Sequence, residues 1–320
     1  MSLFGSECYW RDLLAFTWNI KTMEGREAIG RMLEATLAAT APSAWKIVDG
    51  ATETDGVVEA WFTFETAVAR GKGHLRLRGD KGWTFLTTMA ELKGHEERRG
   101  AMRDNGVTHG AFRNRRSWLE RKRAQEAALG RTEQPYCVII GGGQGGIALG
   151  ARLKRLGVPT IILERNARAG DSWRNRYDSL VLHDPVWYDH LPYLPFPDHW
   201  PVFTPKDQMG DWLEAYAKVM ELDYWTSSSC VGARWDEARR EWEVAVERPA
   251  GSLVLRPKQL VFATGSYGPP RMPKVEGAEI FAGDLCHSSR YVGGEEHRGK
   301  RAVVVGAASS GHDICADLWE

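Results

Sequence analysis

The sequence of 320 residues predicts an α/β protein whose main part is a parallel sheet with helices, preceded by a smaller α+β domain. Three observations predict this class. An apolar run, a glycine-rich turn, a helical stretch and a second apolar run follow one another over 136–163, which is a βαβ pattern. Helical spacing gives way to short β-like runs within residues 1–95. A charged stretch over 96–134 separates the two parts, and at about 150 residues per domain the length suits two domains.

Composition and charge exclude several classes of protein. The 42 Lys and Arg residues balance 42 Asp and Glu residues, so bulk electrostatics offer no case for nucleic-acid binding. No stretch approaches the ~18 consecutive apolar residues of a membrane-spanning helix, and the first residues lack the basic and apolar regions of a signal peptide. We therefore expect a cytoplasmic protein without a membrane partner. Five scattered cysteines without a Cys-x-x-Cys pair argue against a disulfide framework, a zinc ribbon and a redox dithiol.

Residues 1–95 contain two kinds of pattern in succession. Over 8–39, apolar residues recur at spacings of three and four, which predicts helices. Four short runs rich in Val, Trp, Phe and Thr follow, separated by Gly or Asp-Gly turns: 44–48, 57–64, 74–78 and 83–87. Helices followed by an antiparallel meander predict a small α+β domain. This order of elements resembles the cone-shaped nuclear-transport-factor-2-like or SnoaL-like domain, in which a curved sheet wraps around helices and leaves a pocket.

The connector over 96–134 is dominated by arginine and lysine. A basic patch for a polyanion is one interpretation. We favour a solvated linker that carries one surface helix, Ser117 to Leu129, because runs of charge are usually exposed to water.

The glycine-rich turn is the motif that decides the class. Gly141-Gly-Gly143-Gln-Gly-Gly146 lies between an apolar strand and a helix, and a second strand, 160–163, ends at Glu164. Strand, glycine turn, helix and a strand that ends in an acid form the complete dinucleotide-binding fingerprint. The sequence therefore predicts a Rossmann-like dinucleotide-binding domain over 135–299. A glycine-rich turn without a ligand is the alternative.

Each residue of this fingerprint has a physical role. Gly141 allows the tight turn, Gly143 lets the backbone approach a pyrophosphate, and Gly146 lets the helix pack close to the strand. The helix N-terminus offers free N–H groups and a positive dipole to the phosphates. Glu164 can accept hydrogen bonds from ribose hydroxyls. Since a carboxylate there repels a 2′-phosphate, this site suits FAD or NAD rather than NADP.

The residues after Glu164 distinguish between these dinucleotides. Glu164-Arg165-x4-Gly170-Asp171-x-Trp173 resembles the Glu-Arg-x4-Gly-Gly-x-Trp pattern of flavin-containing monooxygenases, except that Asp171 replaces the second glycine. The segments 177–185, 194–197 and 200–206 resemble the YUCCA-like branch of that family. The resemblance implies that Trp173 lies beside the flavin, with a place in the core as the alternative.

Further segments agree with this resemblance. Ala263-Thr264-Gly265 resembles the segment with which two-dinucleotide flavoproteins pass from the FAD domain to the NADPH domain, and Phe281-x-Gly283-x3-His287-x3-Tyr291 matches a signature of the family. A hairpin is expected over 230–246, and its start often places a backbone amide, here that of Val231, on adenine. Thr204 to Asp207 are expected to cap an amphipathic helix whose aromatic stripe is more typical of a core.

A second strand–turn–helix pattern is expected at the end of the sequence. The strand 301–305 leads into Gly306-Ala-Ala308-Ser309-Ser310-Gly311, which resembles the family's NADPH site although Ala308 replaces the second glycine. We interpret 300–320 as the start of a truncated NADPH-binding domain. The residue that would distinguish a 2′-phosphate is expected about 20 residues beyond the last glycine, so we expect the sequence to be a fragment.

The fingerprint and the resemblance together imply a function. The fold is the Rossmann-like FAD-binding domain of the two-dinucleotide-binding type, and the cofactors are FAD and NADPH. The implied reaction is that of a monooxygenase, in which a C4a-peroxyflavin oxygenates a small organic substrate with O2. His183 and Asp184 fall where the family's flavin-edge residues lie, with a structural loop role as the alternative. No other catalytic residue and no metal cluster is assigned.

The implied cofactor-binding residues lie at turns, strand ends and helix starts: Gly141, Gly143, Gln144, Gly145, Gly146, Glu164, Arg165, Ser172, Trp173, His183, Val231, Ala263, Thr264, Gly265, Gly306, Ser309, Ser310 and Gly311. Two other functions stay open. One is a flavin reductase or NADPH oxidase that releases hydrogen peroxide. The other is a non-catalytic module that binds flavin or another ligand. A homodimer also stays open, because cone-shaped domains often pair through their sheets.

Overall fold

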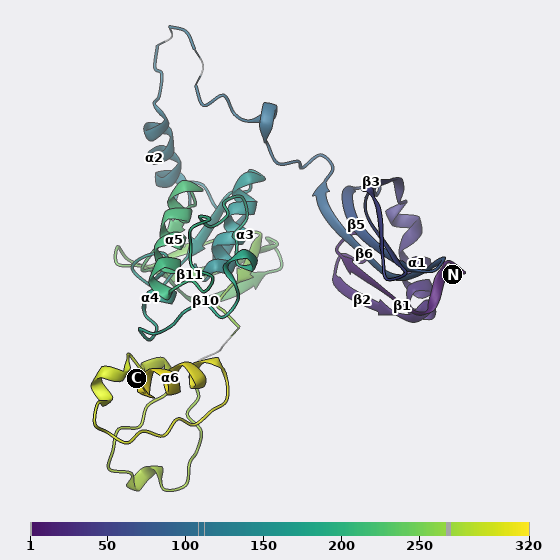
Figure 1. The fold of residues 1–320 in the computed structure, drawn as a ribbon. Helices are drawn as coiled ribbons and strands as arrows, with labels where there is room; N and C mark the ends of the chain where they lie inside the picture. Colours follow the sequence, from purple (N-terminus) through teal and green to yellow (C-terminus); the bar gives the residue numbers. More distant parts are fainter. Residues whose placement is uncertain (1, 108, 112, 267–269, 320) are drawn as a thin grey trace. The chain divides into compact units, whose positions relative to one another are not determined.

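The chain divides into two compact units, Met1–Arg103 and Asp104–Glu320. The computed structural model describes residues 2–107, 109–111, 113–266 and 270–319 (Figure 1). The predicted boundaries at 95, 134 and 299 stay predictions. Among the described helices, none combines the length and the apolar character needed to cross a bilayer.

The first unit is a six-stranded sheet with one long helix. Its elements are β1 (Phe4–Leu13), β2 (Ile20–Glu24), α1 (Gly25–Thr40), β3 (Ser43–Thr54), β4 (Val57–Glu65), β5 (Ala69–Arg78) and β6 (Lys81–Leu92). The strand order is β2-β1-β6-β5-β4-β3, and only the pair β1–β6 is parallel. The predicted meander is present as β3 to β6. Its core consists of Trp10, Phe16, Ile29, Phe62 and Phe64, together with smaller side chains.

The prediction of helices over 8–39 is wrong for its first part, because β1 and β2 form an antiparallel hairpin there. Cys8, Trp10 and Asp12 are buried, whereas Tyr9 and Arg11 between them are not, and this alternation is that of a strand. The Asp12 carboxylate accepts the N–H groups of the turn that follows, at 3.0 and 2.8 Å, and so fixes the hairpin. The helical pattern is confirmed only for α1. The likeness to a nuclear-transport-factor-2-like cone stays a prediction.

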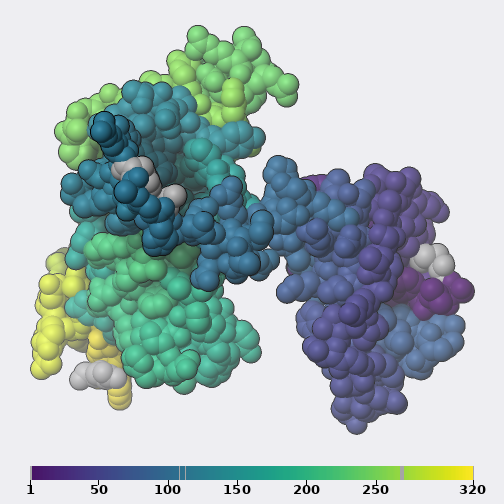
Figure 2. All heavy atoms as spheres, turned by 90° about the horizontal axis from the view of Figure 1, so that it is seen from above, coloured from purple at the N-terminus to yellow at the C-terminus, as the bar shows by residue number. Residues whose placement is uncertain are grey.

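The predicted surface helix of the connector is confirmed as α2 (Trp118–Ala128). A short 3-10 helix, η1 (Gly100–Met102), precedes it within the first unit. Ser117 and Glu120 form a capping box at the start of α2, and the described residues of α2 include none that is buried. Figure 2 shows this blue-teal stretch at the surface. The helix is therefore stabilised by its cap and local charges rather than by a core.

The second unit is built on a four-stranded parallel sheet in the order β13-β7-β8-β9. Its strands are β7 (Cys137–Ile140), β8 (Thr160–Leu163), β9 (Tyr224–Trp225) and β13 (Gln259–Phe262). One face carries the helices α3 (Gln144–Arg155), α4 (Asp171–Arg174) and α5 (Lys206–Val219), with η2 (Val186–Tyr188) in the loops beside them. The other face carries a three-stranded antiparallel sheet, β10 (Ser229–Asp236), β11 (Glu241–Glu247) and β12 (Leu253–Leu255). The predicted α/β class and the hairpin over 230–246 are confirmed.

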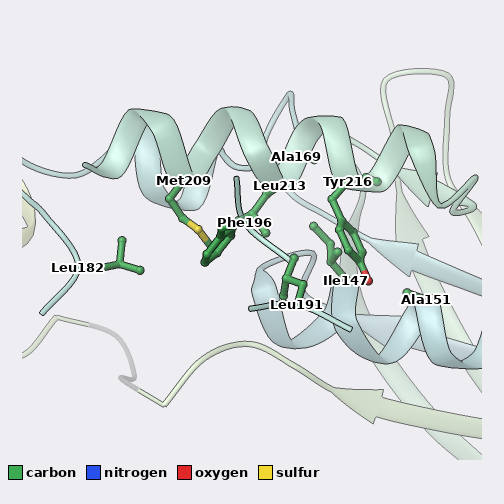
Figure 3. Close-up of a cluster of buried hydrophobic side chains, with 10 residues drawn as sticks. Ile147, Ala151, Ala169, Leu182, Leu191, Phe196, Met209, Leu213 and Tyr216 are labelled. Carbon is green, nitrogen blue, oxygen red and sulfur yellow. The ribbon is translucent and has the colours of Figure 1, made fainter. Parts of the chain in front are cut away.

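The helical layer has a core of its own. Figure 3 shows Met209 of α5 pointing toward Phe196, and Tyr216 of the same helix lying beside Ile147 of α3. This confirms that the aromatic stripe of α5 is core. The expected side-chain cap is wrong: the N-cap is Pro205, without a side-chain hydrogen bond. Instead, the N–H of Lys206, the first residue of the helix, donates to the Leu180 carbonyl of the neighbouring loop at 3.0 Å.

The end of the chain is helical and loop-rich. Three 3-10 turns, η3 (Ala278–Ile280), η4 (Ser288–Arg290) and η5 (Gly294–His297), precede the helix α6 (Ser309–Trp319). The predicted strand 301–305 is wrong, because this segment joins none of the described sheets. Val303 and Val305 are 90% and 75% exposed, so this apolar run has no neighbouring strand to bury it.

Candidate dinucleotide-binding site

At two glycines of the first turn, a Cβ would strike backbone atoms. Gly141 has φ +106°, and a Cβ there would lie 2.3 Å from the Ala263 carbonyl oxygen. A Cβ on Gly146 would lie 2.0 Å from the Gly141 carbonyl oxygen, on the side where α3 meets β7. These contacts agree with the predicted roles in the tight turn and in helix–strand packing.

Two other glycines of the turn have no such structural reason. A Cβ on Gly143 would have only the Ser172 hydroxyl within reach, at 4.0 Å, and one on Gly145 would meet nothing within 4 Å. Gly143 is the N-cap of α3 with φ −74°, a conformation open to any residue. The space in front of the first turn of α3 is therefore clear on the side where its amides point. This cradle fits a diphosphate group that approaches the backbone closely.

Glu164 lies directly beside this turn and is only 5% exposed. One carboxylate oxygen accepts the N–H of Gly142 at 2.9 Å, and the other accepts the N–H of Asn166 at 2.8 Å. Each oxygen keeps a second lone pair, so the carboxylate can still accept a ribose hydroxyl. The structure thus gives Glu164 a role that the sequence did not reveal, because it also holds the glycine turn.

Tyr224 holds the same peptide from the other side. Its hydroxyl donates to the Gly142 carbonyl oxygen at 2.7 Å. Burial, followed by the charges of Glu164 and Asp171, raises the pKa of Tyr224, so the hydroxyl keeps its proton and stays a donor. Sequence reasoning missed this residue. Tyr224 begins β9, which pairs with β8, the strand that leads to Glu164, and no spacing in the sequence indicates this pairing.

The segment after Glu164 forms the short helix α4. Trp173 donates its indole N–H to the Gln144 side chain at 3.2 Å and packs against two buried clusters, so it connects the glycine turn to the core. Arg165 and Ser172 are exposed. Asp171, which departs from the family pattern, is buried and pairs with Arg174 at 3.1 Å. An acid in the first turn of a helix is favourable, and here it also pairs with the Arg174 guanidinium.

The segment Ala263-Thr264-Gly265 lies along the first turn. The Ala263 N–H donates to the Ile140 carbonyl at 2.8 Å, and its carbonyl is the atom that a Cβ on Gly141 would strike. Val231 is 56% exposed and occupies a bulge between Cys230 and Gly232, where the register with β11 shifts. A bulge leaves one residue unpaired, which suits the expected adenine contact of its backbone.

The second turn repeats the glycine geometry of the first. Gly306 has φ +140°, and a Cβ on Gly311 would lie 2.9 Å from the Gly306 carbonyl oxygen, as Gly146 stands to Gly141 at the same spacing of five residues. The helix α6 begins at Ser309, so Ser309 and Ser310 lie in its first turn.

Helix α6 is tied to the loop that follows α4. The Tyr177 hydroxyl donates to Asp313 at 2.6 Å, and the same carboxylate oxygen lies 3.0 Å from Nε2 of His183. One turn later the Tyr291 hydroxyl donates to Asp317 at 2.5 Å. Burial, and next the bond to Asp313, raise the pKa of Tyr177. His183 is therefore oriented by α6, and the sequence did not indicate Asp313 as its partner. Asp184 is exposed.

Comparisons with known proteins show what this half of the chain is similar to. Residues 165–320 match the sequence model of the family described as FMO-like, flavin-binding monooxygenase-like. This part of the chain is similar to flavin-binding monooxygenases. The predicted resemblance to flavin-containing monooxygenases is supported over these residues.

Individual relatives agree with the family. The chain is 38% identical over 201 residues to indole-3-pyruvate monooxygenase YUCCA1 of Oryza sativa subsp. japonica, which covers 62% of the chain and 48% of the relative. It is 37% identical over 183 residues to probable indole-3-pyruvate monooxygenase YUCCA9 of Arabidopsis thaliana, covering 57% and 44%. The chain thus spans about half the length of the curated relatives it matches.

A solved structure is similar in fold. The flavin-containing monooxygenase from Stenotrophomonas maltophilia aligns with a TM-score of 0.53 and 26% identity, covering 58% of this chain and 55% of that one. This likeness confirms the Rossmann-like α/β class. The contacts of the individual site residues with cofactor stay predictions.

Proposed function

We propose that the protein is an FAD-dependent monooxygenase that uses NADPH and O2 to oxygenate a small organic substrate. The observation that carries the proposal is the clear space in front of Gly143 and Gly145, beside the buried carboxylate of Glu164. Neither packing nor backbone conformation explains glycine at these two positions. A phosphate lying against the helix N-terminus does explain it.

Different residues would bind different parts of the two cofactors. The amides at the start of α3 would hold the diphosphate of FAD, and Glu164 the neighbouring ribose. The bulge at Val231 would contact adenine, and Ala263 to Gly265 would border the diphosphate from the adjacent strand. The turn from Gly306 to Gly311 would hold the diphosphate of NADPH.

When bound, FAD would supply the redox chemistry with NADPH and O2, for which side chains are unsuited. The chain's own residues bind and orient. The Glu164 carboxylate would lie beside the ribose and would repel a 2′-phosphate there, which favours FAD over NADPH at the first site. The Tyr177–Asp313–His183 network would hold the flavin-edge loop in one orientation against α6.

The substrate class follows from the relatives' names. Both plant relatives carry the name of indole-3-pyruvate monooxygenases, so an aromatic 2-oxo acid is the substrate we propose to assay first. Oxygen transfer and peroxide release are separable outcomes of the same cofactor chemistry. If the protein transfers oxygen, it should give product in proportion to the NADPH consumed, with little hydrogen peroxide. Stoichiometric peroxide without product would instead indicate an NADPH oxidase.

The first test is an absorption spectrum of the purified chain, followed by identification of the released cofactor after denaturation. We expect visible flavin bands and FAD as the released nucleotide. Gly143→Ala is the matched variant. The folded chain has room for its methyl group, but this methyl group would occupy the space that a bound diphosphate needs. A colourless wild-type protein that takes up no FAD, or one that releases NAD, would contradict the proposal.

A further inference from the structure

A cavity of about 370 Å³ lies on the second unit, away from the glycine turn. Its wall comes from the residues after α2 and from the connection between β11 and β12, and it includes Arg131, Gln134, Arg248 and Ser252. Ligand pockets of proteins start at about 300 Å³, so the space is sufficient for a small molecule. None of the lining residues belongs to the candidate dinucleotide site.

Arg248 is held in a fixed orientation at this cavity. Its guanidinium carbon lies 4.0 Å from the centroid of the Trp225 ring, and its Nε donates to the Ser228 hydroxyl at 3.1 Å. Stacking and one hydrogen bond occupy the face and one edge of the group. The two terminal amino groups form the part of the fork that can bind an oxyanion in a bidentate way.

The two arginines in the wall of this cavity form no ion pair with the described residues. Its described lining includes no Asp or Glu, and no ion pair within 4.0 Å connects Arg131 or Arg248 to a described carboxylate. By contrast, two other arginines of this region pair with Glu243. They are Arg234 of β10, at 2.5 Å, and Arg256, which follows β12, at 2.7 Å. Arg131 and Arg248 line the same cavity, so their like charges lie close to one another. Burial, followed by the charge of Arg131, lowers the pKa of Arg248.

Two neutral groups add further donors. The Ser252 hydroxyl belongs to the lining, and Gln134 uses its carbonyl oxygen to accept the Arg256 N–H at 2.8 Å, which leaves its amide NH₂ as a donor. Two arginines, a hydroxyl and an amide NH₂ match the oxygens and the double negative charge of a phosphate group. A carboxylate would leave one of the two positive charges uncompensated.

We propose that this cavity binds the phosphate group of a small phosphorylated molecule between Arg131 and Arg248. The phosphate occupies the arginine end, and the remaining volume takes the organic part. This site is separate from the proposed FAD site and does not depend on the proposed monooxygenase activity.

The test is isothermal titration calorimetry on the purified chain as isolated, at constant ionic strength maintained with chloride. Inorganic phosphate, ribose 5-phosphate and ribose are titrated separately. We expect saturable binding of both phosphates and none of ribose. Tighter binding of ribose 5-phosphate assigns the site to a phosphorylated metabolite, whereas equal binding assigns it to free phosphate.

Variants locate the binding. Arg248→Gln and Arg131→Gln should each weaken phosphate binding at least tenfold, because each removes charge-assisted hydrogen bonds. Arg131→Gln tests the idea even if the half-buried Arg248→Gln variant folds poorly, since Arg131 is exposed. Arg234→Gln, an exposed arginine paired on the same sheet, is the matched control and should bind as wild type. The FAD content should be equal in all four proteins. Unchanged phosphate binding in both cavity variants, or no saturable binding to wild type, would overturn the proposal.

Discussion

Alanine substitutions at Gly143 and Gly146 should separate ligand binding from folding. In Gly146→Ala the new Cβ would lie 2.0 Å from the Gly141 carbonyl oxygen, whereas real Cβ contacts stay above about 3.0 Å. Helix and strand must move apart by roughly 1 Å, and overpacking of this kind costs about 1–3 kcal/mol or more. In Gly143→Ala the nearest atom is the Ser172 hydroxyl oxygen at 4.0 Å, and the backbone is already in an alanine conformation. We expect its unfolding free energy to stay within about 1 kcal/mol of wild type.

Gly143→Ala should weaken the binding of FAD, although it leaves the unfolding free energy nearly unchanged. A methyl group between the turn and the diphosphate pushes the phosphate off one or two backbone N–H donors. Hydrogen bonds to a charged group contribute about 1.5–3 kcal/mol each, and 1.4 kcal/mol is tenfold in affinity. The Kd for FAD should therefore rise at least tenfold.

Urea unfolding of the apoproteins and fluorescence titration with FAD measure the two quantities. Gly146→Ala should lose stability and FAD binding together, and Gly143→Ala should lose FAD binding alone. Wild-type affinity in a folded Gly143→Ala protein would refute the reasoning, since the diphosphate could not then lie on this turn.

Three further perturbations test the surroundings of the turn. Glu164→Ala leaves two backbone N–H groups without an acceptor, so the unfolding free energy should fall by about 2–6 kcal/mol in urea; a fall under 1 kcal/mol would contradict this. Tyr224→Phe should lower the unfolding free energy by about 0.5–1.5 kcal/mol and speed the dissociation of FAD. An unchanged dissociation rate would argue against a role of Tyr224 at the turn. Burial raises the pKa of the Cys137 thiol to about 11, so thiolate forms in the unfolded chain first. Stability present below about pH 8.5 should therefore be lost progressively toward pH 11 in wild type, and less in Cys137→Ala.

The first dinucleotide turn could be predicted from sequence because its chemistry is local. Glycines at fixed spacing, a helix start and an acid at the next strand end all lie within 24 residues, from 141 to 164. The structure adds what local patterns cannot show. The hydroxyl of Tyr224 reaches Gly142 from 82 residues away, and Asp313 reaches His183 from 130 residues away. Such partners depend on which strands and loops become neighbours, and no spacing in the sequence records that.

The two elements that the sequence predicted wrongly, at β1 and at 301–305, have related causes. In β1, apolar residues fit a period of two and also spacings of three and four, and only burial by the sheet decides between them. In 301–305, an apolar run predicts a strand, but a strand forms only when a neighbour accepts its hydrogen bonds. Helix α6 needs no such neighbour, because its hydrogen bonds lie within the helix, and it forms where the sequence predicts.

The presence or absence of a neighbouring strand also predicts that the two glycine turns bind their dinucleotides with unequal affinity. The first turn is fixed from outside by Glu164, Tyr224 and Ala263, all from neighbouring strands or their ends. The turn at Gly306 has the glycine geometry, but the described residues place no strand beside the segment that leads into it. A binding loop that must be ordered by its ligand loses affinity to that ordering, at about 1–2 kcal/mol per residue fixed. In this chain, NADPH should therefore bind at least a hundredfold more weakly than FAD, as separate titrations with each ligand can measure. Comparable affinities would mean that glycine geometry alone preorganises the second site.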